Sequence, residues 1–134
     1  MKILKNNKGE GYIDIVVMVL VFSLMIAFVL KLYPVFIEKD NLNKFASEIV
    51  REVEIKGELG SSVYSRKDVL EKSLGKIDDI QWNNKYISGT KKIQLGDSIE
   101  VIVKKQVNIG FFDFGSFPIT LQSKDSGYSE VYWK

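Results

Sequence analysis

An unbroken apolar run near the start of the chain constrains its fold more than any other feature. The run extends from Ile15 to Leu30, and Ser23 is its one polar residue. As a helix it rises about 24 Å at ~1.5 Å per residue, and apolar neighbours on both sides extend it toward the roughly 30 Å of a bilayer core. The rest of the chain, roughly a hundred residues, is too small to cover a helix that is apolar on every side. We therefore predict a transmembrane segment over about residues 12–33.

A buried core helix and a cleaved secretory signal peptide are the alternatives for this segment. The run is longer than the usual apolar region of a signal peptide, and residues 31–34 (KLYP) carry no small-x-small cleavage pattern. The sequence therefore favours a retained membrane helix, with cleavage as its main rival.

The distribution of charge predicts the orientation of the segment. Lys2, Lys5 and Lys8 precede Gly9, whereas from Glu10 onward 16 Lys and Arg face 17 Asp and Glu. By the positive-inside rule the basic start stays cytoplasmic and the chain after about residue 35 lies outside. We therefore predict a single-pass protein of the cell membrane with its C-terminal domain outside the cell. An extracellular filament is a second predicted location.

Composition excludes several classes of chemistry. The chain contains no cysteine and no histidine, which removes thiol nucleophiles, disulfides, thiolate zinc sites and imidazole bases. A net charge of +2 argues against nucleic-acid binding. The triplet Asp113-Phe114-Gly115 spells the kinase magnesium motif, but the chain is too short for a kinase. We predict no enzyme, no metal or cofactor, no small-molecule substrate and no nucleic-acid partner.

The residues after the apolar run predict an α+β fold. An amphipathic helix over residues 40–56 continues the membrane helix, with a kink near Pro34 and an end at Gly57. A short helix over residues 66–74 follows, with Ser65 as its candidate cap. In the helix over residues 40–56, the apolar residues at helical spacing identify the face that packs in the core: Leu42, Phe45, Ala46, Ile49, Val50 and Val53.

Alternating apolar residues later in the chain predict strands. Residues 99–109 form one long strand, and Lys105 interrupts its apolar row, which indicates a sheet edge or a strand end. Shorter strands are predicted around residues 80–82, 93–95, 117–121 and 128–133, with turns at 96–97 and 124–127. The prediction is a long N-terminal helix, residues 10–57, packed on an antiparallel sheet of four to five strands. Residues 1–9 form a basic leader, and residues 58–134 a small extracytoplasmic domain.

The membrane entrance carries a motif: residues 8–14, Lys-Gly-Glu-Gly-Tyr-Ile-Asp, lead directly into the apolar run. A carboxylate at the edge of a bilayer costs free energy, up to ~2.5–3.5 kcal/mol at mid-membrane and less near an end. If the chain is cut nearby, the new α-amine can pair with Asp14 on the same or a neighbouring subunit. The alternative is that Asp14 sits at the headgroups or caps the helix start.

This region resembles type IV pilins and the TadE-like pseudopilins, which have a short basic leader, a Gly at the cut and an acidic fifth mature residue. The resemblance implies that a membrane-embedded prepilin peptidase cuts between Gly9 and Glu10, which makes Asp14 the fifth residue. The family's acidic residue is normally Glu, and a charged first residue is unusual, so a cut after Lys8 or Gly11, or none, stays open. The implied function is a pilin-like structural subunit. Its implied partners are the membrane, self or related pilins, the peptidase and an assembly platform driven by a cytoplasmic ATPase.

A second resemblance covers most of the chain. The phrases NKGEGYIDIVV, FASEIVREVEI and GSFPITL…GYSEVYWK are similar to an uncharacterised, TadE-like family of small membrane proteins associated with Gram-positive mobile elements. It implies a pilus, secretion or conjugation-type component. The alternative is a single-pass accessory or scaffold protein of such a machine that never polymerises.

Four phenylalanines crowd residues 111–117. They are candidates for subunit or membrane contacts, and the alternative is a loop that folds its rings over the open end of the sheet. The four are Phe111, Phe112, Phe114 and Phe117.

Overall fold

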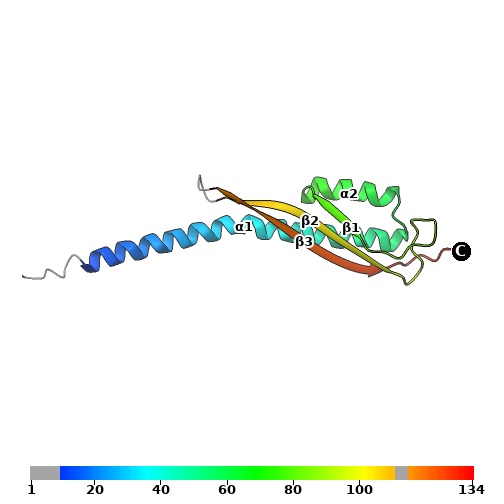
Figure 1. Ribbon diagram of the computed structural model, residues 1–134, viewed down its shortest axis with the longest axis horizontal. Coiled ribbons are helices and arrows are strands. Elements are labelled where there is room, and N and C mark those ends of the chain that lie inside the picture. The colour runs from blue at the N-terminus through cyan, green and yellow to red at the C-terminus, as the bar shows by residue number, and fades with distance from the viewer. Residues whose placement is uncertain (1–9, 111–114) are drawn as a thin grey trace, which may run out of the picture.

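The first helix dominates the architecture. The computed structural model describes residues 10–110 and 115–134, and its longest element, α1, has 47 residues, about 70 Å at the rise of an α-helix. Figure 1 shows the N-terminal half of α1 standing free, while its C-terminal half lies along the sheet. The elements in order are α1 (Glu10–Lys56), α2 (Ser61–Leu74), β1 (Asp79–Trp82), β2 (Ser98–Gly110) and β3 (Ser116–Tyr128).

Pro34 lies inside α1 and does not interrupt it. Proline removes one backbone hydrogen bond and crowds the preceding turn, which is why the sequence predicts a kink there. Figure 1 shows α1 as one continuous, gently curved rod. The free N-terminal half of α1 and the half that packs on the sheet therefore form one continuous helix.

The core of the head lies between the second half of α1, the shorter helix α2 and one face of the sheet. The predicted apolar face of α1 is confirmed, since each of its six positions from Leu42 to Val53 is at most 3% exposed. The sheet contributes Ile99, Val101 and Val103, each fully buried. α2 adds Val63 and Leu70 beside them. The core of the head therefore combines residues 42–53 of α1 with α2 and the sheet.

The described sheet has three antiparallel strands in the order β1-β2-β3. The prediction of four to five strands is wrong, although the strands at 80–82 and 99–109 are confirmed. Residues 124–127 were predicted to turn, yet Asp125, Ser126 and Gly127 pair with Val101, Glu100 and Ile99 of β2. Pairing in register with the long strand outweighs the turn preference of the local sequence.

The predicted strand at residues 93–95 is also absent. Ile93 is fully buried, but its backbone N–H donates to the carbonyl of Gly57 at 2.7 Å. Only Lys92 forms an isolated bridge, to Glu58, and Leu95 is exposed. This segment is a loop held against the end of α1. Of its two apolar residues, only Ile93 is buried in the core.

α2 is longer than predicted and begins at Ser61, with Gly60 as its N-terminal cap. Its first turn is held by the carbonyl of Gly60, which accepts the N–H groups of Val63 and Tyr64. Ser65 therefore lies within the helix. The predicted end at residue 74 is confirmed: the next residue, Gly75, has φ +97° and its N–H donates to the Glu71 carbonyl.

The C-terminal tail, residues 129–134, replaces the last predicted strand and fastens the head. We call it the C-terminal clasp. Its Ser129 hydroxyl donates to the Ile93 carbonyl at 2.9 Å, and the Trp133 indole N–H donates to the Gly57 carbonyl at 3.1 Å. The Lys92 ammonium lies 4.0 Å from the centre of the Trp133 ring. Thus the phrase GYSEVYWK ties the end of α1 to the 91–97 loop.

Replacing Trp133 with phenylalanine tests the clasp. The change keeps most of the buried ring and removes the indole hydrogen bond, so we expect the free energy of unfolding to fall by about 1 kcal/mol. The measurement is urea unfolding of the full chain in detergent, followed by the fluorescence of Trp82. Tyr132→Phe is the control because Tyr132 is 65% exposed. Equal effects of the two changes would contradict a specific role for the indole.

Candidate functional site

The free half of α1 is exposed around its whole circumference. From Gly11 to Leu30 each side chain is exposed except Ala27, which is half-buried. The most apolar 18-residue window has a mean hydropathy of 2.9 and none of it is buried. A buried core helix is therefore excluded within this head, and burial of the segment requires lipid or other molecules.

Ser23, the one polar residue of the run, is satisfied within the helix. Its hydroxyl donates to the carbonyl of Val19 at 2.8 Å. A hydroxyl that back-bonds in this way does not add an unpaired donor to a hydrocarbon environment. The run from Ile15 to Leu30 consequently presents only apolar surface to its surroundings.

The residues of the predicted processing motif lie at the beginning of α1. Glu10 is the first residue of the helix, and Gly9 lies outside the described residues. Asp14 follows one turn after Glu10, with an exposed side chain. It is the one acidic or basic residue between Gly11 and Leu30. Figure 1 shows that the N-terminal end of α1 is the end farthest from the head. Because α1 begins at Glu10, Asp14 lies near that end.

One of the four aromatic candidates lies within the described residues. Phe117 is in β3, pairs with Ile109 of β2 and is 66% exposed. Phe111, Phe112 and Phe114 lie outside the residues that the structure describes. The structure does not bring Phe117 together with Asp14, so the two predicted contact sites are separate.

Two charged contacts join α1 to the β2–β3 hairpin. The Lys105 ammonium lies 2.5 Å from the Glu38 carboxylate, and both side chains are partly buried. The neighbouring Lys39 donates to the backbone carbonyl of Gln122. We call these contacts the ionic collar. The sequence signal for it was Lys105 itself, which breaks the apolar row of β2 immediately after the last residue that β1 pairs, Lys104.

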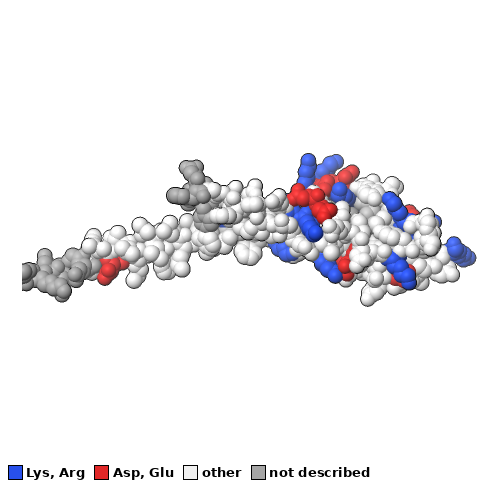
Figure 2. Space-filling view, viewed as in Figure 1, with Lys and Arg blue, Asp and Glu red and all other residues white. Residues whose placement is uncertain are grey.

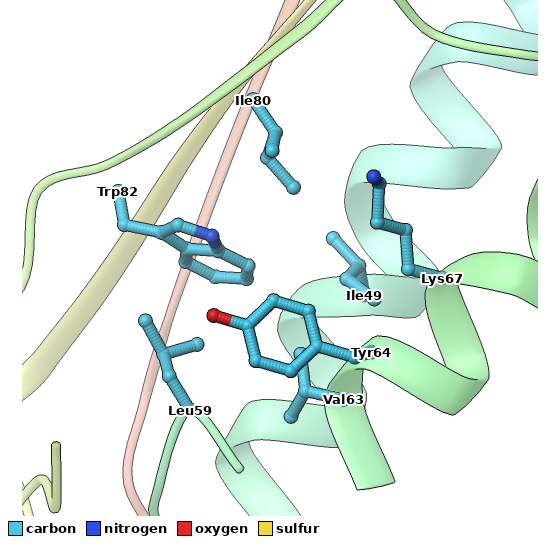
Figure 3. Close-up of a pocket in the computed structure, with 7 residues that line it drawn as sticks. All are labelled: Ile49, Leu59, Val63, Tyr64, Lys67, Ile80 and Trp82. Atoms are coloured by element: carbon cyan, nitrogen blue, oxygen red, sulfur yellow. The ribbon is translucent and has the colours of Figure 1, made fainter. Parts of the chain in front are cut away.

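A small cavity lies inside the head (Figure 3). Its volume is about 40 Å³ and its lining is mostly apolar. Ligand sites usually measure roughly 300–1,000 Å³, so this space fits imperfect packing between α1, α2 and β1. In residues 10–110 and 115–134 no group of three or more acidic side chains is arranged to hold a metal ion. The lining residues are Ile49, Leu59, Val63, Tyr64, Lys67, Ile80 and Trp82.

One ion pair between β2 and β3 contributes to the stability of the head. The Lys124 ammonium, 2.7 Å from the Glu100 carboxylate, lowers the pKa of Glu100, and the Asn83 amide adds to the effect. Because the lowered pKa belongs to the folded state, the pair stabilises the head at neutral pH. That contribution is lost as the pH falls through the lowered pKa.

A long helix that is apolar on every side and carries a small α+β head fits a single-pass membrane anchor. Residues 19–134 match the model of a family described as a domain of unknown function (DUF4320), and the chain belongs to this family. No curated protein and no solved structure matches it. The matched region covers the head and most of the apolar run, and it begins after Gly9, Glu10 and Asp14.

Proposed function

We propose that the protein is a pilin-like structural subunit of a surface assembly of the pilus, secretion or conjugation type. The observation that carries the proposal is the free half of α1, which is apolar on all sides and bears one carboxylate near its start. In a membrane this surface contacts lipid, and in an assembly it packs against the same surface of other copies. Since α1 runs unbroken into the core, lateral packing of the helices also positions the heads.

Asp14 has a defined task in this proposal. A cut between Gly9 and Glu10 creates an α-amine at the first residue of α1, one helical turn from the Asp14 carboxylate. Pairing between the amine of one subunit and Asp14 of the next offsets the cost of the carboxylate at the edge of the bilayer. The same pairing sets the axial offset between neighbouring helices.

Mapping the N-terminus tests the processing step. We expect the intact mass of the membrane-extracted protein to correspond to a chain that begins at or near Glu10 when a prepilin peptidase is present, and at Met1 when it is absent. A full-length product under both conditions would contradict processing. It would favour the alternative, a non-polymerising accessory or scaffold protein that keeps its basic leader.

Asp14→Asn tests the assembly step separately. The change removes the charge at nearly constant shape, so we expect crosslinked oligomers to fall at least tenfold while membrane insertion and head stability stay unchanged. Asp14→Glu is the matched control and should retain oligomers, because it preserves the carboxylate. Oligomers that survive Asp14→Asn would contradict a pairing role for this residue.

The proposed orientation places the head outside the cytoplasm. The chain has no cysteine, so Lys85→Cys, at an exposed position of the head, provides a unique label. A membrane-impermeant maleimide should modify it in intact cells. Modification only after lysis would reverse the orientation.

A further inference from the structure

The core-facing row of the β2–β3 hairpin continues beyond the core that covers it. Val101 and Val103 of β2 are fully buried, and after Lys105 the same face continues with Val107 and Ile109. Their partners on β3 are Ile119 and Phe117, which are 39% and 66% exposed. Apolar side chains that face inward in the head thus become an exposed apolar surface at the end of the hairpin. We call residues 107–110 and 116–119 the hairpin tip.

Charged residues become sparse along the hairpin at the same level as along α1. The ionic collar, made by Glu38 and Lys39 of α1, holds Lys105 and Gln122 of the hairpin. From Gln106 to Ser123 the sequence contains a single charged residue, Asp113. In Figure 2 most charged side chains gather over the head, while the free half of α1, apart from an acidic patch near its start, and the adjoining part of the hairpin are largely white. Along α1 beyond the collar, Lys31 is the one charged residue between Glu38 and Asp14, so both elements become largely uncharged past the collar.

The hairpin tip points along α1 toward the membrane segment. Figure 1 shows the β2–β3 hairpin running back beside α1, in the direction of its N-terminal half. From Lys105 to Gly110 a strand advances about 16 Å, whereas α1 rises only ~8 Å from Glu38 back to Tyr33. Even with the hairpin inclined to α1, its tip reaches the level at which the predicted transmembrane segment begins.

We propose that the hairpin tip inserts into the interfacial layer of the membrane that α1 spans, on the side of the head. A bilayer has an interfacial layer of about 5–8 Å on each side of its hydrocarbon core, and an uncharged apolar surface that carries Phe117 suits that layer. The occupant is lipid rather than a protein partner, because the hairpin runs beside α1 toward the segment that spans the bilayer, so the tip meets the same membrane. Lacking charge in its described residues, the tip requires no anionic headgroup.

This second contact would orient the head. A single helix leaves the head free to tilt about the point where α1 leaves the membrane, and a second point of contact removes that freedom. The inference depends on α1 spanning a membrane, and it is independent of whether the protein polymerises.

The test compares two aromatic positions of β3. Phe117 at the tip and Tyr128 at the far end of the strand are 66% and 65% exposed, so each should tolerate replacement by cysteine. Each single-cysteine variant of the full chain is labelled with the environment-sensitive fluorophore NBD and reconstituted into phosphatidylcholine vesicles. The quenchers are nitroxide-labelled phosphatidylcholine in the bilayer and iodide in the water.

We expect lipid-borne nitroxide to quench the label at residue 117 several-fold more than the label at 128, and iodide to show the opposite order. Equal iodide quenching at both positions would overturn the proposal. Shielding of residue 117 from both quenchers would indicate a protein contact and would also overturn it, as would failure of the chain to integrate into vesicles. A label at Ser116, which is exposed within the hairpin tip, provides a second position should the Phe117 variant fail to fold.

Discussion

Gly57→Ala is expected to lower the free energy of unfolding of the head by about 3 kcal/mol, from strain and crowding together. Gly57 ends α1 at φ +65°, a region that alanine adopts at a cost. An added Cβ would lie 2.6 Å from the Cβ of Val131 and 3.0 Å from the Trp133 indole nitrogen. Relief would require the C-terminal clasp to move, although Trp133 donates to the carbonyl of Gly57 itself.

Gly89→Ala separates the two contributions to this effect. Gly89 also has a positive φ, +75°, but no atom lies within 4 Å of its added Cβ. We expect this variant to lose about 1 kcal/mol, the cost of the backbone conformation alone. Urea unfolding in detergent, monitored by tryptophan fluorescence, measures both variants. Equal losses would contradict close packing of the clasp on the end of α1.

Phe45→Ala is expected to destabilise the head by about 3–5 kcal/mol, the usual range for removing a fully buried phenylalanine. Phe45 is 1% exposed and lies on α1 against the buried row of β2. Its removal leaves a cavity where the helix that carries the membrane segment meets the sheet. We expect the membrane half of α1 to remain inserted while the head unfolds at lower urea.

Phe36→Ala is the matched control on the same helix. Phe36 is 69% exposed and precedes the first buried position of α1. Because it contributes nothing to the core, we expect a change within about 0.5 kcal/mol. If Phe36→Ala and Phe45→Ala lowered the free energy of unfolding by similar amounts, the packed part of α1 would begin before Glu38. That result would contradict the structure.

The candidate site was predictable to the extent that it depends on local sequence. The exposure of the apolar run and the position of Asp14 at the start of α1 follow from residues adjacent in the chain. The ionic collar could not be predicted from the sequence, because Glu38 and Lys105 are distant in the chain. Only the fold brings the Lys105 ammonium to 2.5 Å from the Glu38 carboxylate. Phe117 could be identified as a candidate for exposed aromatic surface, whereas its pairing with Ile109 at the end of the β2–β3 hairpin depends on the register of the two strands.

What the sequence determined by itself is what short-range periodicity and composition control: the membrane-length helix, the buried face from Leu42 to Val53, and the long strand β2. The tertiary structure decided the number of strands and the role of the C-terminus. Residues 124–127 have a turn-forming composition, yet pairing with β2 keeps them extended. Residues 129–134 alternate like a strand, yet their hydrogen bonds go to the 91–97 loop and the end of α1. Such choices depend on partners far away in the chain, and local preferences are too weak to specify them.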